Sequence, residues 1–244
     1  MRKLRLLIHC LMKKILFTVV IAICFVSQMR AARPSPDLEM GVSAVGGYNP
    51  AWGLNAGLDL DGKLSLKDTL DISFAFEGLN DNVWSFGLTA RPKVNFRPGT
   101  LYADVTAFVR LVARDRLYDF IVAGSAGWKM KHFDFQLGLF SRVSQYLRSP
   151  APEKVLREPT NLLYKLQFNI LGDRARWDIL GGVKNFTEYE YERMRAPIFY
   201  VGGRFDCNDR LGLRAEFDVK PSGILHMTAG FFGVTGRLGA TYKF

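Results

Sequence analysis

Three residues near the end of the chain have the side-chain types of an acyl hydrolase. Asp218, Ser222 and His226 supply a carboxylate, a hydroxyl and an imidazole within nine residues. In such enzymes the imidazole takes the proton of the hydroxyl nucleophile, and the carboxylate orients the imidazole. The trio would suit an enzyme that acts on phospholipid or lipid A, but the segment lacks a recognisable nucleophile motif. We therefore expect loop residues without coupled chemistry, with the hydrolase as the alternative.

Other residue groups offer less chemistry. Glu188, Glu190 and Glu192 alternate with tyrosines in one loop, which indicates a solvated charged loop rather than the clustered carboxylates of an aspartyl protease. The chain has no histidine pair and no acidic calcium loop at a usable spacing for a metal. Its glycine doublets lack the strand-to-helix context of a phosphate cradle. We predict no catalytic residue, no metal site and no cofactor.

The first 32 residues have the composition of an export signal. They hold six basic residues, no acidic residue and an apolar run from Ile15 to Val26, which suits a signal peptide and is short for a membrane-spanning helix. We predict a signal peptide over 1–32, with Met12 as an alternative start and an undefined cleavage site, followed by one domain over 33–244. Removal of the signal lowers the net charge from +10 to +4 and leaves Cys207 as the only cysteine. The remaining charge forms no basic stripe, which argues against nucleic-acid binding.

After this segment, apolar and polar residues alternate almost throughout. Residues 70–77, Leu-Asp-Ile-Ser-Phe-Ala-Phe-Glu, show the pattern. A period of two is typical of strands with one apolar and one polar face, and no run has apolar residues at helical spacing. Turn residues such as Asp61-Gly62 separate the runs. We place twelve strands, within a range of ten to fourteen, at 38–47, 51–60, 64–78, 83–96, 101–112, 117–129, 132–143, 161–171, 176–186, 197–205, 210–219 and 234–244.

An even strand number fits a closed, antiparallel up-and-down barrel that crosses a membrane, with both termini on the same side. Charges of both signs recur at polar positions, as expected of a hydrated lumen, although a solvated outer face is an alternative: Arg91, Asp104, Arg110, Asp119, Asp134, Arg204, Arg214, Glu216 and Arg237. Aromatic residues gather near strand ends, as in interfacial girdles: Tyr48, Trp52, Trp84, Trp128, Trp177, Tyr200, Tyr242 and Phe244. A soluble periplasmic, lipocalin-like barrel stays the alternative, because alternation does not say which face is wet.

The last eight residues carry the most specific pattern. Residues 237–244 read polar-x-Gly-x-x-aromatic-x-Phe, with Gly239, Tyr242 and the final Phe244 in the marked positions. This pattern resembles the C-terminal β-signal of Gram-negative outer-membrane β-barrel proteins, and the ending is similar to that of uncharacterised small members of this class. The resemblance implies residence in the outer membrane, contact with its lipid and recognition by the barrel-assembly machinery. It implies no activity.

The role of such a barrel is left open by its fold. We expect either a structural or interaction role or a narrow pore, because twelve strands enclose a modest lumen. Loops 144–160 and 187–196 are candidates for contact with a protein partner, the second because it combines tyrosines with charges. Segments 144–160 and 220–233 are the candidates for an inward-folded plug.

Overall fold

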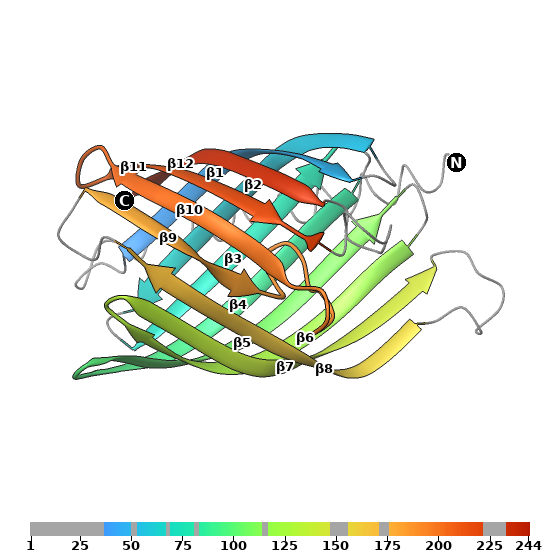
Figure 1. The fold of residues 1–244 in the computed structure, drawn as a ribbon, viewed down its shortest axis with the longest axis horizontal. Helices are drawn as coiled ribbons and strands as arrows, with labels where there is room; N and C mark the ends of the chain where they lie inside the picture. Colours follow the sequence, from blue (N-terminus) through green and yellow to red (C-terminus); the bar gives the residue numbers. More distant parts are fainter. Residues whose placement is uncertain are drawn as a thin grey trace, which may run out of the picture. The chain divides into compact units, whose positions relative to one another are not determined.

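The structure of this protein is a computed structural model that describes residues 37–49, 53–66, 69–80, 83–113, 117–146, 156–170, 176–221 and 233–244. The predicted signal peptide lies outside these residues. Figure 1 shows strands inclined to the barrel axis, and hydrogen bonds join them into a closed antiparallel barrel in which each strand pairs with its neighbours in sequence. The strands are β1 (Asp37–Asn49), β2 (Gly53–Leu66), β3 (Leu70–Leu79), β4 (Val83–Phe96), β5 (Gly99–Val112), β6 (Leu117–Met130), β7 (Phe133–Tyr146), β8 (Leu156–Asn169), β9 (Trp177–Lys184), β10 (Ile198–Asp206), β11 (Leu211–Val219) and β12 (Val234–Lys243).

The predicted fold class is confirmed: an all-β, antiparallel, up-and-down barrel of twelve strands. Most strands match the predicted runs, but the bounds 51–60 and 64–78 are wrong, because β2 continues to Leu66 and β3 begins at Leu70. Every strand has enough residues to cross or nearly cross a bilayer when tilted. No helix in the described ranges is long and apolar enough to cross a membrane.

The Asp61-Gly62 pair, predicted as a turn, lies inside β2 instead. The Asp61 carboxylate faces the barrel interior, where Arg214 Nη1 donates to it at 2.9 Å. Gly62 faces outward, where an added Cβ would come within 2.4 Å of the Phe74 ring. The pair therefore continues the alternation of the strand. Asp61 binds Arg214 inside the barrel, and Gly62 leaves room for the Phe74 ring outside.

The predicted long loop 144–160 is shorter than expected, since β7 continues to Tyr146 and β8 begins at Leu156. Their pairing shifts register between Phe140 and Arg142. Pro159 lies in this irregular stretch, which suits a residue without a backbone N–H to donate to the ladder. The remainder of this loop lies outside the described residues, as does most of 220–233, so the structure does not test whether they fold inward.

The barrel closes between its first and last strands. β1 pairs with β12 from Glu39 opposite Lys243 to Tyr48 opposite Val234. The three residues of the predicted assembly signal therefore belong to the closing strand or end it. Gly239 faces the lumen, and the rings of Tyr242 and Phe244 make an edge contact with centroids 5.0 Å apart on the outer face. Their recognition by the assembly machinery stays a prediction.

We expect Gly239→Ala to weaken this seam. An added Cβ would lie 2.1 Å from Ser43 Oγ and 2.3 Å from the Val42 carbonyl oxygen, and the carbonyl cannot retreat without disturbing β1. Overpacking of this kind costs roughly 1–3 kcal/mol, so the fraction of protein in the compact, unheated band of semi-native electrophoresis should fall. Gly124→Ala is the matched control, because among the described residues nothing lies within 4 Å of a Cβ there. Equal folded fractions for the two variants would contradict the prediction.

The apolar face of the alternating strands points outward. Leu54 is 80 % exposed and Leu238 is 68 % exposed, values far above those of a water-soluble core residue. Further exposed apolar residues occur all round the barrel, including Leu58, Leu88, Val105, Val122, Leu137, Leu139, Val201, Leu213 and Phe217. A lipocalin-like barrel would bury this face inside, so the soluble alternative is wrong. A belt of this kind is stable when lipid covers it.

Aromatic pairs surround the end of the barrel at which the C-terminus lies. The ring pairs are Phe96–Trp128 at 6.3 Å, Phe133–Phe168 at 5.5 Å, Trp177–Phe205 at 4.5 Å and Tyr242–Phe244 at 5.0 Å. Each pair lies beside a turn or terminus at that end. The structure thus places the predicted residues Trp128, Trp177, Tyr242 and Phe244 where an interfacial girdle would lie.

The other predicted aromatic residues have different positions. Trp84 packs on Phe76 with ring centroids 5.8 Å apart, near the opposite end of the barrel, and Tyr48 is half-exposed at that end. Trp52 lies outside the described residues. Tyr200 does not belong to a girdle, because it shares the inward phase of β10 and is buried inside.

Candidate functional site

The structure places each of the nine charged residues predicted to line a lumen on the inner face of the barrel. On the wall formed by β4 to β7, Arg91 donates two parallel hydrogen bonds to Asp104, at 2.6 and 2.7 Å. Gln136 donates to the same carboxylate at 2.8 Å, and the Tyr102 hydroxyl donates to Asp134 at 2.7 Å. Bidentate, charge-assisted contacts hold these side chains in fixed orientations.

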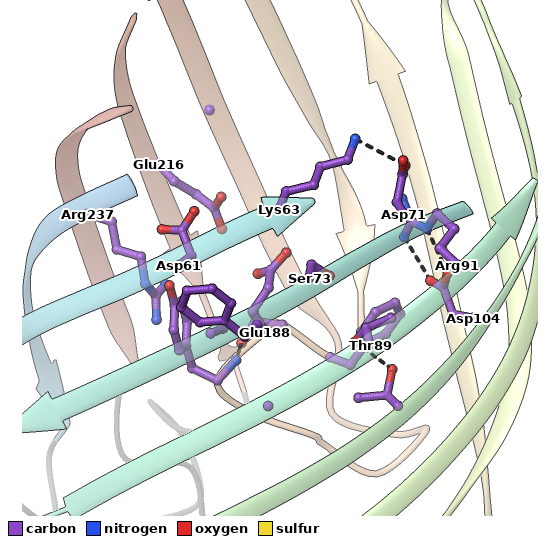
Figure 2. Close-up of a pocket in the computed structure, with 18 of the residues that line it drawn as sticks. Asp61, Lys63, Asp71, Ser73, Thr89, Arg91, Asp104, Glu188, Glu216 and Arg237 are labelled. Carbon is purple, nitrogen blue, oxygen red and sulfur yellow. Dashed lines mark hydrogen bonds and ion pairs between the residues drawn. The ribbon is translucent and has the colours of Figure 1, made fainter. Parts of the chain in front are cut away.

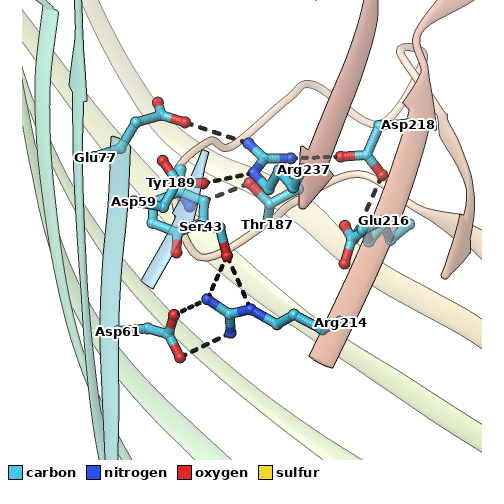
Figure 3. Close-up of polar contacts among 11 residues, drawn as sticks. Ser43, Asp59, Asp61, Glu77, Thr187, Tyr189, Arg214, Glu216, Asp218 and Arg237 are labelled. Carbon is cyan, nitrogen blue, oxygen red and sulfur yellow. Dashed lines mark hydrogen bonds and ion pairs between the residues drawn. The ribbon is translucent and has the colours of Figure 1, made fainter. Parts of the chain in front are cut away.

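Arg237 organises the opposite wall (Figure 3). Its guanidinium donates to Asp59 at 2.9 Å, to Asp218 at 2.9 Å and to Glu77 at 3.3 Å. The three carboxylates are buried, Asp59 completely so, and Arg237 itself is partly buried. One cation is therefore shared by carboxylates from three other strands, and closure of β12 onto β1 and β11 brings them together.

Further ion pairs continue around this wall. Lys184 Nζ lies 2.9 Å from Glu216 and 3.8 Å from Asp218. Arg214 binds Asp61 with both ends of its guanidinium group and also donates to Ser43 Oγ. Closer to the chain termini, Arg204 on β10 also points inward. It forms ion pairs with Glu39 and Asp206. The lumen thus has charges of both signs, held mainly in pairs.

The connection between β9 and β10 folds into the barrel. We call residues 185–197 the lumen loop. An isolated bridge joins Phe186 to Tyr191, and the Thr187 N–H donates to the Glu190 carbonyl at 2.7 Å. The Asn185 side chain fastens the base of the loop, since it donates to the carbonyls of Leu162 and Glu192 and accepts from the Tyr164 N–H. These contacts make a compact hairpin out of a segment that the sequence suggested would be solvated.

Charged side chains of the wall bind the backbone and one carboxylate of the lumen loop. Arg110 donates to the Tyr189 carbonyl at 2.7 Å, and Arg142 donates to the Tyr191 carbonyl. Lys220, at the end of β11, forms a buried ion pair with Glu190. The guanidinium of Arg237 lies 5.0 Å from the centre of the Tyr189 ring, a cation–π distance. The loop is therefore held from β5, β7, β11 and β12, across the width of the lumen.

An apolar patch on the inner wall receives the aromatic side of the loop. Phe108, Ile121, Phe140 and Leu163 are buried together with Tyr191, and Phe186 packs against them. The Tyr191 ring lies 5.4 Å from Phe108 and 5.5 Å from Phe140, measured between centroids. Burial raises the pKa of Tyr191 and of Tyr189, so both hydroxyls stay protonated.

The sequence contained a signal for this patch that the alternation pattern concealed. Phe108, Ile121 and Phe140 occupy positions in phase with Arg110, Asp119 and Arg142, which are lumen positions. Apolar residues at polar positions of three consecutive strands require an apolar partner inside the barrel. The Tyr-rich segment 186–191 is that partner.

A cavity of about 420 Å³ lies between the lumen loop and the end of the barrel that carries the C-terminus (Figure 2). Most of the residues that line it carry hydroxyl, amide or charged groups, and apolar side chains such as Leu163 and Leu180 complete the wall. Thr187, Glu188, Tyr189 and Tyr191 form its boundary on the side of the loop. The loop therefore bounds this cavity on one side, and we call the cavity the vestibule.

The hydrolase alternative finds little support in the described part of the chain. Asp218 lies inside the barrel and is bound to Arg237, while Ser222 and His226 lie outside the described residues. The described residues include no group of three or more His, Cys, Asp or Glu side chains placed to hold a metal ion. Cys207 is a free cysteine that is partly exposed.

No model of a known protein family matches this sequence, and no characterised protein matches it at the sequence level. Solved structures match by fold. The NanC porin is 10 % identical, with a TM-score of 0.55 over 83 % of this chain and 100 % of that one. This chain has an outer-membrane β-barrel fold. A KdgM porin in complex with disordered oligogalacturonate is 9 % identical, with a TM-score of 0.51 over 84 % of this chain and 99 % of that one. Similarity at this level of identity concerns the architecture alone.

Proposed function

We propose that this protein is a narrow pore of the outer membrane of a Gram-negative bacterium, which admits small hydrophilic solutes. The observation that carries the proposal is the pairing of a polar vestibule with a loop that narrows the lumen beside it. A barrel with a purely structural role could fill its interior with apolar side chains. This one instead keeps ionised and hydroxyl groups around open space, which is what a path for hydrated solutes needs.

The similar structures support a pore without supplying its substrate. KdgM binds oligogalacturonate, an acidic oligosaccharide. In the described part of this lumen, arginine and lysine side chains are matched by carboxylates, for example Arg91 by Asp104 and Arg214 by Asp61. We therefore do not propose an acidic oligosaccharide as the solute that this chain transports.

The test is single-channel recording of the refolded protein in a planar lipid bilayer. We expect small, discrete conductance steps, well below those of 16–18-strand porins, because the barrel is narrower and the lumen loop reduces it further. Semi-native electrophoresis of the same preparation establishes that the barrel is folded. Absence of steps from folded protein in several salts would overturn the pore proposal and favour a structural role.

An interaction role is a second candidate, and the exposed tip of the β9–β10 connection supports it. Within the predicted partner segment 187–196, Tyr189, Glu190 and Tyr191 face the lumen and are buried. The expectation that this whole loop is exposed is therefore wrong. Arg193, Met194 and Arg195 are exposed, so a partner that contacts this loop would meet these three residues. Contact of a partner with segment 144–160 stays a prediction.

A further inference from the structure

Glu188 differs from its neighbours in the lumen loop. Thr187, Tyr189 and Glu190 are buried, whereas Glu188 is exposed and its carboxylate projects into the vestibule (Figure 2). No ion pair of the described residues involves this carboxylate. It is therefore an acidic group of the lumen loop that is accessible to a solute and forms no ion pair with a described residue.

The basic side chains that line the same vestibule are already paired. Lys63 pairs with Asp71, Arg91 with Asp104, Arg204 with Glu39 and Asp206, Arg214 with Asp61, and Arg237 with three carboxylates. A paired guanidinium or ammonium presents little net field to a passing anion. The vestibule consequently lacks, in the described part of the chain, an unpaired positive charge to balance Glu188.

A second group of residues also indicates negative charge beside the lumen loop. The wall beside the loop groups five acids, Asp59, Glu77, Glu190, Glu216 and Asp218, around three cations, Lys184, Lys220 and Arg237. The group therefore contains two more acidic than basic side chains. Asp59 Oδ1 and Asp218 Oδ1 are buried and lack a hydrogen-bond partner in the described structure. Acidic side chains are therefore in excess on this side of the lumen loop, whereas Arg110 and Arg142 donate to its carbonyls from β5 and β7.

We propose that the pore prefers cations to anions and that Glu188 is the residue that sets this preference. The inference rests on the proposed pore function and gives it a solute class: small inorganic or organic cations. A carboxylate at the narrowest point of a path lined by low-dielectric protein attracts cations and repels anions at close range. The loop anchors supply the fixed position that such a selectivity residue needs.

The test is the reversal potential of the refolded protein under a KCl gradient, which gives the permeability ratio of K⁺ to Cl⁻. We expect this ratio to exceed unity for the unmodified protein and to fall in Glu188→Gln. The fall should be on the order of 25-fold, because a unit charge about 4 Å away in water favours the cation about fivefold and disfavours the anion about fivefold. Glu188→Lys should carry the ratio further toward anions. Asp209→Asn is the matched control, since it removes one negative charge from an exposed turn outside the vestibule and should leave the ratio unchanged.

The outcomes separate this inference from the pore proposal. Conductance with a ratio at or below unity, or a Glu188→Gln ratio equal to that of the unmodified protein, would overturn the inference and leave the pore intact. Absence of conductance from folded protein would remove both. The preference should weaken as the salt concentration rises, because mobile ions screen Glu188.

Discussion

Replacement of residues 187–196 by a short glycine–serine turn is expected to raise the single-channel conductance several-fold. The lumen loop crosses the interior and brings the rings of Tyr189 and Tyr191 against opposite walls, at Arg237 and at Phe108. Among the described residues, removal of this segment leaves mainly strand side chains in the lumen, so the cross-section at this level grows toward that of an empty twelve-strand barrel. Planar-bilayer recording measures the change directly.

Two further variants test whether the inward-facing half of the lumen loop limits the conductance. Tyr191→Ala should raise conductance by a smaller amount, because it removes the ring that packs on Phe108 and Phe140 while the backbone bonds of the loop persist. The double substitution Met194→Ser and Arg195→Ser changes exposed residues of the same loop and should leave conductance unchanged. Unaltered conductance in the loop replacement, with a folded barrel on semi-native gels, would show that the loop is not the constriction.

Arg237→Gln is expected to cause the largest loss of stability of any single lumen substitution that we consider. The guanidinium binds Asp59, Glu77 and Asp218, which are between 0 and 7 % exposed as side chains. Its removal leaves three buried carboxylates without their shared cation, and breaking a buried ion pair from one side costs roughly 3–5 kcal/mol. The temperature at which the compact band disappears in semi-native electrophoresis should fall markedly.

The control for this prediction is a basic residue in an exposed pair. Lys63→Gln removes the partner of Asp71, but the Lys63 side chain is 48 % exposed and Lys93 also contacts that carboxylate, at 2.7 Å. The expected cost is about 1 kcal/mol or less. Addition of Asp59→Asn to Arg237→Gln should recover part of the loss, because it removes one of the stranded charges. A melting temperature for Arg237→Gln equal to that of Lys63→Gln would refute the assigned role.

The local alternation of apolar and polar residues was sufficient to predict most of the fold. Runs such as 70–77 indicate a strand with one apolar face whatever surrounds it, and the twelve runs with their intervening turns predicted a closed barrel of the observed strand number. The same phase placed residues such as Asp104 and Arg214 on the inner face. Errors arose where one residue pair was interpreted in isolation: Asp61-Gly62 has turn chemistry, yet an arginine far along the chain uses its carboxylate.

The direction of the lumen loop was not determined by local sequence. A segment that alternates Glu and Tyr satisfies the requirements of an exposed loop, and its burial depends on partners far away in sequence: Phe108, Arg110, Phe140 and Lys220. Likewise, Arg237 and Asp59 are 178 residues apart, and only closure of β12 onto β1 makes them neighbours. The sequence by itself determined the strands, their number and the face of each side chain, because these follow from a period of two along a single strand. Only the tertiary structure decided which charges pair, where the lumen narrows and which acid faces the vestibule. These features depend on contacts between residues far apart in the sequence, such as those made when β12 pairs with β1.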